Sequence, residues 1–270
     1  MAGLPAPDSA GTCLITGASS GIGEALAHEL AARGHGVTLV ARREDRLRSL
    51  AGELQERHSI RAEVLGCDLA DRTARATLPA RVAELRLRVD VLVNNAGFGS
   101  YGNFVELDEN GEVEQVRVNC EAVVALCGAF VPRMVERRSG AVLILSSTTG
   151  FQPTARYATY AAAKAFSLSF GQSLHAELRN SGVAVTTVCP GPVATDFFSK
   201  NEVRPVRLPR AMWATPEQVA RAAVDGMSRN RRVVIPGTAV RALMATSRMS
   251  PSGLQLRVMD VLLPRKAAKR

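Results

Sequence analysis

The sequence predicts a single-domain α/β protein whose doubly wound parallel sheet is covered by helices on both faces, giving three layers. Two observations lead to this fold. Short, continuously apolar runs alternate with longer amphipathic segments, and such runs are typical of parallel strands buried on both faces. The chain has 270 residues, 46% of them hydrophobic and 22% charged, which suits one domain around one core. Such a sheet binds ligands at the carboxyl ends of its strands, where the strand order reverses.

Seven apolar runs predict the strands, and six amphipathic segments between them predict the helices. The expected strands are Thr12–Thr16, Gly36–Ala41, Ala62–Gly66, Val89–Asn94, Ala141–Ser146, Val183–Cys189 and Arg232–Ile235. The expected helices are Ile22–Arg33, Arg43–His58, Asp71–Leu87, Asn110–Glu136, Ala158–Asn180 and Pro216–Arg229. We expect residues 1–11 to form an N-terminal tail, residues 12–236 the sheet domain, and residues 237–270 a basic helical extension.

The net charge of +9 lies entirely in the C-terminal part of the chain. Residues 221–270 contain nine arginines and two lysines against two aspartates, so the first 220 residues are neutral overall. A basic field over the whole protein, as nucleic-acid binding requires, is therefore not predicted. The N-terminus has neither the basic nor the apolar region of a signal peptide, and no His or Cys spacing suggests a metal site. We expect a cytoplasmic protein that does not cross a membrane.

A glycine-rich turn follows the first strand directly. Its residues are Thr16, Gly17, Ala18, Ser19, Ser20, Gly21, Ile22 and Gly23. Glycines permit a tight turn and close backbone approach, and the helix that follows presents N–H groups to an anion such as a pyrophosphate. The turn therefore predicts a dinucleotide site.

The end of the second strand predicts which dinucleotide binds there. NAD-selective proteins of this kind carry an acidic residue at this position, which accepts hydrogen bonds from the ribose 2′-hydroxyl. Here the position holds Ala41, and Arg42 follows, which can bind a 2′-phosphate. We predict NADP(H) rather than NAD(H), and we interpret Arg43 as the solvated start of the next helix.

Tyr160 and Lys164 predict the chemistry, because residues four apart share one face of a helix. The lysine ammonium would lower the pKa of the tyrosine, so that Tyr160 exchanges a proton near neutral pH. Ser147, at the end of the fifth strand, would donate a hydrogen bond to the same substrate oxygen. Its neighbour Ser146 is the alternative for this role.

These motifs, in this order, resemble the short-chain dehydrogenase/reductase family, in the subtype with the TGxxxGxG turn and the YxxxK pair. The resemblance rests on Thr16–Gly23, the run Asn94-Asn95-Ala96-Gly97, Asn119, Ser147, Tyr160 with Lys164, and Pro190-Gly191. It covers residues 12–196. It implies a Rossmann-like fold and a hydride transfer that interconverts a carbonyl compound and an alcohol. The 13-residue step from Ser147 to Tyr160 is similar to that of the family and favours Ser147 over Ser146.

The resemblance also implies roles for further residues. Lys164 would bind the ribose of the nicotinamide, and Asn119 would hold a water that connects Lys164 to solvent. Asn119 can instead be an ordinary asparagine that bonds locally within its helix. Asp68 would bind the adenine, or else cap the next helix. The remaining expected cofactor contacts are Leu69, Asn95, Ala96, Gly97, Pro190, Gly191, Val193 and Thr195.

The expected substrate loop is residues 196–215, which contain Phe197, Phe198, Met212 and Trp213 beside Arg204, Arg207 and Arg210. An apolar wall with cationic groups suits an acyl chain on an acidic carrier, and a lid with solvated arginines is the alternative. Phe98, Phe151 and Tyr157 are expected to line the substrate pocket together with Ser147 and Tyr160.

Two functions compete with a reductase on this fold. One is an epimerase or dehydratase with tightly held nicotinamide, and the other is a non-enzymatic dinucleotide sensor. We also expect a homodimer or homotetramer. The extension, with helices at Thr238–Ser247 and Leu254–Leu263, has three interpretations. Packing on a partner subunit is favoured over an amphipathic arm on an anionic membrane and over a loosely ordered basic tail.

Overall fold

A seven-stranded parallel sheet forms the centre of the computed structural model, which describes residues 2–195, 209, 212–247 and 250–262. The strand order is β3-β2-β1-β4-β5-β6-β7, so the order reverses between β1 and β4. Ile15 of β1 pairs with Leu39 of β2 on one side and with Val93 of β4 on the other. The strands are β1 Gly11–Thr16, β2 Val37–Ala41, β3 Ala62–Gly66, β4 Arg88–Asn94, β5 Gly140–Leu145, β6 Val183–Val188 and β7 Val233–Val234.

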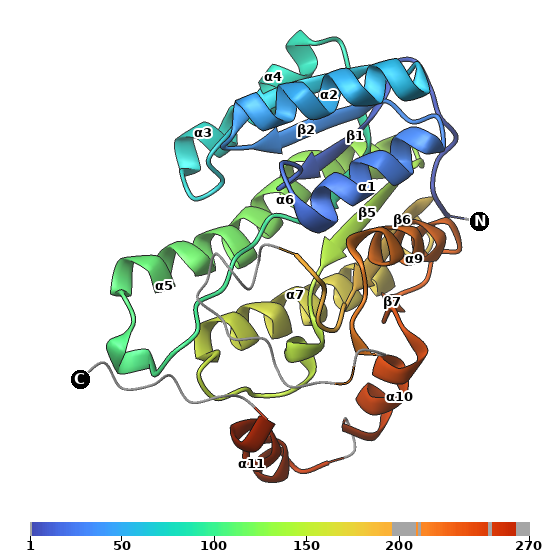
Figure 1. The fold of residues 1–270 in the computed structure, drawn as a ribbon. Helices are drawn as coiled ribbons and strands as arrows, with labels where there is room; N and C mark the ends of the chain where they lie inside the picture. The colour runs from blue at the N-terminus through green and yellow to red at the C-terminus, as the bar shows by residue number, and fades with distance from the viewer. Residues whose placement is uncertain (1, 196–208, 210–211, 248–249, 263–270) are drawn as a thin grey trace.

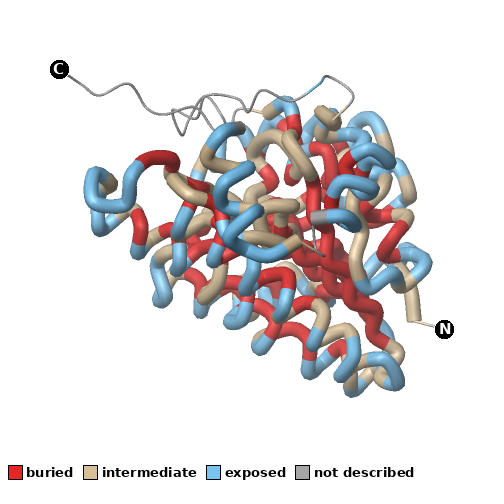
Figure 2. Tube along the Cα trace, turned by 90° about the horizontal axis from the view of Figure 1, so that it is seen from below, coloured by how far each residue is buried: buried red, intermediate tan, exposed pale blue. Residues whose placement is uncertain are grey.

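Helices cover both faces of the sheet, and each face has its own apolar core. One core joins the sheet to α1 (Gly21–Ala32), α2 (Glu44–His58) and α9 (Pro216–Ser228). The other joins it to α4 (Leu78–Glu84), α6 (Ala122–Glu136) and α7 (Ala158–Glu177). Figure 2 shows the buried centre and the exposed outer surfaces of the helices. The predicted three-layer, Rossmann-like α/β fold is confirmed.

The alternation of apolar side chains explains why these segments pack as they do. Leu26 and Leu30 of α1 lie one turn apart and are both fully buried, as are Leu47 and Leu54 of α2. Burying one such side chain contributes about 1.5–3 kcal/mol. The strands are apolar throughout because both of their faces are covered; for example, neither Leu14 nor Ile15 of β1 is exposed.

The single helix predicted over residues 71–87 is wrong. The segment forms two helices, α3 (Arg72–Ala76) and α4, which meet at Thr77. Pro79 lies in the first turn of α4. Proline lacks the N–H that a continuing helix needs and clashes with the preceding turn, so the first helix ends just before it.

The helix predicted over residues 110–136 is present, but its hydrogen bonding changes in the middle. It consists of α5 (Glu109–Val116), a π-helical turn at Arg117–Glu121, and α6. Within the described residues, the stretch Glu109–Glu136 is the one helical segment long and apolar enough to span a bilayer, and half of its most apolar window is buried in the protein. The core helices of soluble proteins can be equally long and apolar, so this helix is only weak evidence for a membrane span.

Two further helices lie where the extension was expected to be helical, α10 (Thr238–Ser247) and α11 (Ser252–Leu262). Figure 1 shows both beyond α7, at the end of the molecule away from α2. Val240 and Met244 of α10 are buried. Two short 3₁₀ turns, Phe104–Glu106 and Thr148–Phe151, complete this end of the fold.

Candidate active site

The glycine-rich turn between β1 and α1 is held tightly against the end of β4. Gly17 has a φ of +66°, and a Cβ there would lie 2.8 Å from the Cα of Ala96. Nδ2 of Asn95 donates to the carbonyl oxygen of Thr16 at 2.8 Å. No side chain of the described residues caps the N-terminus of α1. Its first N–H groups therefore suit an anionic ligand.

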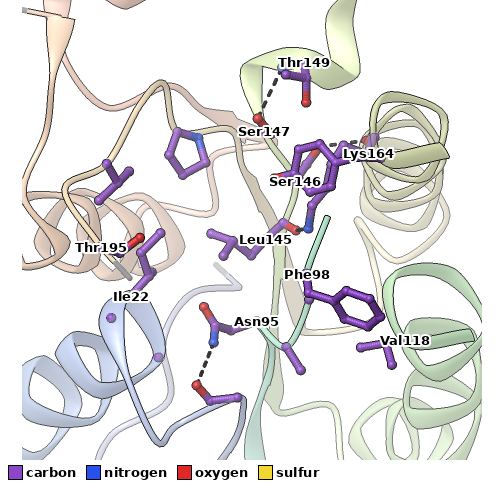
Figure 3. A pocket seen from close by; sticks show the side chains of 18 of the residues that line it. Ile22, Asn95, Phe98, Val118, Leu145, Ser146, Ser147, Thr149, Lys164 and Thr195 are labelled. Atoms are coloured by element: carbon purple, nitrogen blue, oxygen red, sulfur yellow. Dashed lines mark hydrogen bonds between the residues drawn. The ribbon is translucent and has the colours of Figure 1, made fainter. Parts of the chain in front are cut away.

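A cavity of about 780 Å³ opens at the carboxyl ends of β1, β2, β4 and β5, across the point where the strand order reverses. Figure 3 shows its interior, with Ile22, Asn95 and Thr195 on one side and Ser147 and Lys164 on the other. All the predicted cofactor contacts line it: Gly17, Ser19, Ser20, Gly21, Ile22, Gly23, Arg42, Asp68, Leu69, Asn95, Ala96, Gly97, Tyr160, Lys164, Pro190, Gly191, Val193 and Thr195. The sequence-based set thus forms one continuous surface.

Two arginines stand at the end of β2, and the sequence prediction for the second is wrong. Arg43 is not merely a solvated helix start, because its Nη2 donates to the side chains of Ser19 (2.9 Å) and Ser20 (3.1 Å) in the glycine-rich turn. Arg42 is two-thirds exposed and lies 3.6 Å from a carboxylate oxygen of Glu114 on α5. Both arginines and Glu114 line the cavity. Neither Arg43 nor Glu114 belongs to a motif that would have marked it.

Asp68 lies in the cavity wall rather than at a helix cap. Its side chain accepts the N–H of Ala70 at 3.0 Å, and Arg42 lies 4.0 Å from it. The cap of α3 is Asp71, which accepts the N–H groups of Thr73 and Ala74. The alternative interpretation of Asp68 as a helix cap is therefore wrong.

Ser147 and Tyr160 meet at the other end of the cavity. Ser147 follows β5, and its side chain hydrogen-bonds to Tyr160 while accepting the N–H of Thr149 at 3.2 Å. Ser146 instead donates to the carbonyl oxygen of Lys164 at 2.7 Å and ties α7 to β5. Of the two serines, Ser147 is therefore the one beside Tyr160.

Lys164 lies beneath Tyr160 on the same face of α7. Its ammonium is 5.6 Å from the centroid of the Tyr160 ring. The same ammonium donates to the carbonyl oxygen of Leu145 at 3.0 Å (Figure 3). Only 4% of the residue is exposed. The predicted placement of both side chains on one helical face agrees with this geometry.

Burial dominates the protonation of this pair. Desolvation raises the pKa of Tyr160 to about 12, and the hydrogen bond from Ser147 opposes it only in part. Desolvation also lowers the pKa of Lys164 to about 8. The prediction that the ammonium lowers the pKa of Tyr160 below its ordinary value is wrong for this arrangement, because the cost of burying a phenolate is larger. Tyr160 is accordingly a protonated hydrogen-bond donor at neutral pH.

Asn119 lies in the π-helical turn and is 1% exposed. Its Nδ2 donates to the carbonyl oxygens of Phe98 (2.8 Å) and Gln115 (2.9 Å). Its Oδ1 has no hydrogen-bond partner within the described part of the chain, and it faces Gly97, where a Cβ would lie 2.4 Å from Oδ1 and 3.3 Å from Nζ of Lys164. A buried acceptor needs a partner, and π turns are frequent at functional sites. The water-holding role stays a prediction.

The expected substrate residues divide into three groups. Phe98, Tyr157 and Met212 line the cavity, as do Ser147 and Tyr160. Phe151, at the end of the 3₁₀ turn after β5, and Trp213 of the expected substrate loop are half-buried, and neither is part of the cavity wall. Most of the expected substrate loop, residues 196–208 and 210–211, lies outside the described residues. Among the wall residues that the sequence did not predict, four come from the extension: Val240, Leu243, Met244 and Met259.

Comparison with known proteins decides the family. The model of the family described as short chain dehydrogenase matches residues 11–204. The chain belongs to the short-chain dehydrogenase family. It is 34% identical over 221 residues to a very-long-chain 3-oxoacyl-CoA reductase of Anas platyrhynchos, an alignment that covers 78% of this chain and 67% of the relative.

Two further members of the short-chain dehydrogenase family bear on function. A short-chain dehydrogenase from Sphingobium yanoikuyae in complex with NADPH has a TM-score of 0.79 at 34% identity, covering 96% of this chain and 98% of the other. The human inactive hydroxysteroid dehydrogenase-like protein 1 is 31% identical over 205 residues, which are 75% of this chain and 61% of that protein. Family membership therefore does not by itself establish activity.

The residues of this short-chain dehydrogenase fit a dinucleotide. The uncapped start of α1 and the close approach allowed by Gly17 suit a pyrophosphate, and Arg42 and Arg43 supply positive charge beside the end of β2. The buried Lys164 lines the same cavity, where its ammonium would donate a hydrogen bond to a hydroxyl of the cofactor.

Proposed function

We propose that this protein is an NADP(H)-dependent oxidoreductase that interconverts a carbonyl group, in a ketone, aldehyde or ketoacyl compound, and the corresponding alcohol. The observation that carries the proposal is the contact between Ser147 and Tyr160 above the buried Lys164, in the same cavity as the glycine-rich turn. One end of the cavity can hold a dinucleotide, and the other can hold a proton next to a reacting carbonyl.

The chain's own contribution to the reduction is a proton and its placement. NADPH, when bound, supplies the hydride. Tyr160 is protonated at neutral pH, so its hydroxyl donates the proton that the carbonyl oxygen takes up, and Ser147 donates a hydrogen bond to that oxygen. The ammonium of Lys164 stabilises the phenolate that remains on Tyr160. Oxidation of the alcohol uses the same groups in reverse.

The preference for NADP(H) is supported by the charges at the end of β2. Ala41 stands where a carboxylate would repel a 2′-phosphate, and Arg42 and Arg43 both line the cavity there. The NADPH complex of the relative from Sphingobium yanoikuyae supports the same choice.

A panel of ketones, aldehydes and alcohols assayed with NADPH, NADH and their oxidised forms tests the proposal. We expect stoichiometric loss of NADPH absorbance with at least one carbonyl compound. Conversion of a substrate without net NADPH consumption would indicate an epimerase or dehydratase instead. Binding of NADPH without conversion of any compound would indicate a sensor, a function that the name of the human relative keeps open. The hydroxyl of Tyr160 favours an enzyme, because a sensor does not need a proton donor.

We also propose that the protein forms a homodimer or homotetramer through the outer surface of α5, α6 and α7. Val113, Val116 and Val124 follow one another at helical spacing and are between 44% and 45% exposed, and Phe166 of α7 is 38% exposed. Because α5 contacts α7, these apolar side chains lie on neighbouring helices, and exposed apolar surface is typical of protein interfaces. Light scattering of the wild type and of Val116→Asp tests this, with a loss of oligomeric mass expected in the variant. Lost sedimentation with anionic liposomes after deletion of residues 253–270 would instead support the less favoured membrane-surface role of the extension.

A further inference from the structure

Three tyrosines form a cluster between the active site and the C-terminal extension. The ring centroids of Tyr101 and Tyr157 are 4.9 Å apart, and those of Tyr157 and Tyr160 are 5.8 Å apart. Met259 of α11 packs against this cluster and lines the cavity. A residue of the extension thus contacts the aromatic group that includes Tyr160.

An ion pair between Arg156 and Asp260, called the tether below, connects α11 to this cluster. Arg156 pairs with Asp260, the residue next to Met259. The Arg156 side chain is only 10% exposed, and the residue directly precedes Tyr157. Its carbonyl oxygen accepts the N–H of Gly102 at 3.0 Å, beside Tyr101. The tether therefore connects α11 to the backbone of two cluster tyrosines, without itself lining the cavity.

The wall that the extension contributes is apolar. Val240, Leu243 and Met244 of α10 line the cavity together with Met259. Among the described lining residues, the charged side chains are Lys164 and the four near the end of β2, namely Arg42, Arg43, Asp68 and Glu114. Apart from Lys164, the described wall near Tyr160 is therefore uncharged, and methionine adapts its shape to an irregular apolar ligand.

We propose that α11 is a selective wall of the substrate site: Met259 sets the size of substrate that reaches Tyr160, and the Arg156–Asp260 tether holds this wall in place. The substrates are bulky, apolar carbonyl compounds. The proposal rests on the proposed reductase function and adds the substrate class. The outer side of the same helix, with Leu254 (53% exposed), Val258 (48%) and Val261 (85%), plays no part in this wall.

Two diketones of the same chemistry and different size test the role of Met259. The probes are butane-2,3-dione, which is small, and benzil, which carries two phenyl rings. Met259→Trp narrows the site, and we expect kcat/KM for benzil to fall by ~10-fold or more, since a single methylene of misfit in an apolar pocket costs roughly 10–200-fold. Butane-2,3-dione should change by less than ~3-fold, and Met259→Ala should shift the benzil preference in the opposite direction.

Val258→Ala is the matched control, because Val258 lies on the same helix and faces outward. It should leave the ratio of the two kcat/KM values unchanged. Equal effects of Met259→Trp on both diketones, or the same shift in the control, would overturn the role of Met259. If the wild type reduces no carbonyl compound with NADPH, the proposed function itself fails, and the tether is still decided by the experiment below.

Hydrogen exchange of the α11 amides tests the tether independently of activity. Asp260→Asn removes the negative charge that pairs with Arg156, so we expect faster exchange across residues 252–262 and a higher KM for benzil with little change in kcat. The exchanged pair Arg156→Asp with Asp260→Arg should restore slow exchange, because aspartate tolerates the positive φ of 62° at position 156. Unchanged exchange in Asp260→Asn would overturn the tether.

Discussion

Replacing Arg43 by leucine separates two contributions to cofactor binding. In the structure, Nη2 of Arg43 bonds to Oγ of Ser19, the carbonyl oxygen of Ser19 and Oγ of Ser20, at 2.9, 3.3 and 3.1 Å. The guanidinium thus holds the glycine-rich turn in place through these three hydrogen bonds, which we call the brace, and it places positive charge at the end of β2. The loss of the brace affects NADPH and NADH alike, whereas the loss of the charge affects only the cofactor with a 2′-phosphate.

The expected loss of cofactor affinity in Arg43→Leu follows from the charged hydrogen bonds that the substitution removes. A hydrogen bond to a charged group contributes about 1.5–3 kcal/mol, which corresponds to a factor of roughly 10–150 in Kd. Titration of the purified Arg43→Leu protein with NADPH and NADH, followed by cofactor fluorescence, should show the larger loss for NADPH. Arg48→Leu is the control, since Arg48 is exposed on α2 and pairs with Glu44 one turn away. Equal losses for both cofactors would refute the phosphate role of Arg43, and unchanged affinities would refute the brace as well.

Three other predictions concern the charged groups of the cavity. Glu114→Gln removes the carboxylate that lies 3.6 Å from Arg42 and competes with the cofactor for it. Because exposed ion pairs contribute about 0.2–1 kcal/mol, NADPH should bind to the variant up to ~5-fold more tightly than to the wild type at low salt and equally at high salt. Weaker binding of NADPH to the variant would contradict this. The rate of carbonyl reduction should fall as pH rises through about 8, where Lys164 loses its proton while Tyr160 keeps its own up to about 12; a rate that stays flat to pH 10 would be inconsistent. Lys164→Met should abolish turnover without lowering the free energy of unfolding at pH 7. The lowered pKa of Lys164 costs the folded wild type about 3 kcal/mol at this pH, and removing that cost offsets the loss of the hydrogen bond to Leu145. In the wild type, Lys164 binds its proton more tightly in the unfolded state than in the folded state. The free energy of unfolding of the wild type should therefore rise as pH rises from about 8 towards the ordinary lysine pKa. Chemical denaturation of Lys164→Met should not show this rise.

The sheet and the catalytic group were predictable because their signals are local in the sequence. An apolar run with a glycine-rich turn behind it specifies β1 and α1 whatever lies elsewhere, and the spacing of Tyr160 and Lys164 places them on one helical face. The break between α3 and α4 was also readable, since Pro79 stands inside the predicted helix, but the apolar periodicity continues across it and hid the boundary.

The misses depend on contacts between distant segments. Arg43 reaches back 24 residues to Ser19, and Glu114 reaches Arg42 from α5, so neither neighbourhood in the sequence marks them. The raised pKa of Tyr160 depends on burial, which a spacing argument cannot supply. Likewise, Met259 joins the site from almost 100 residues beyond Tyr160. None of the three interpretations of the extension included a contact of α11 with the chain's own cavity, which Met259 makes. Packing of the extension on a partner subunit or on a membrane stays a prediction.

Turnover of Tyr160→Phe with bound NADPH tests the central claim most directly. The substitution keeps the ring in its cluster with Tyr157 and removes only the hydroxyl that bonds to Ser147. With a carbonyl compound that the wild type reduces, kcat should fall by ~10² or more, the usual contribution of a positioned proton donor, while the Kd for NADPH stays within a few-fold of the wild-type value. Undiminished turnover in a variant that binds NADPH normally would show that Tyr160 is not the proton donor, and the proposed mechanism would be wrong.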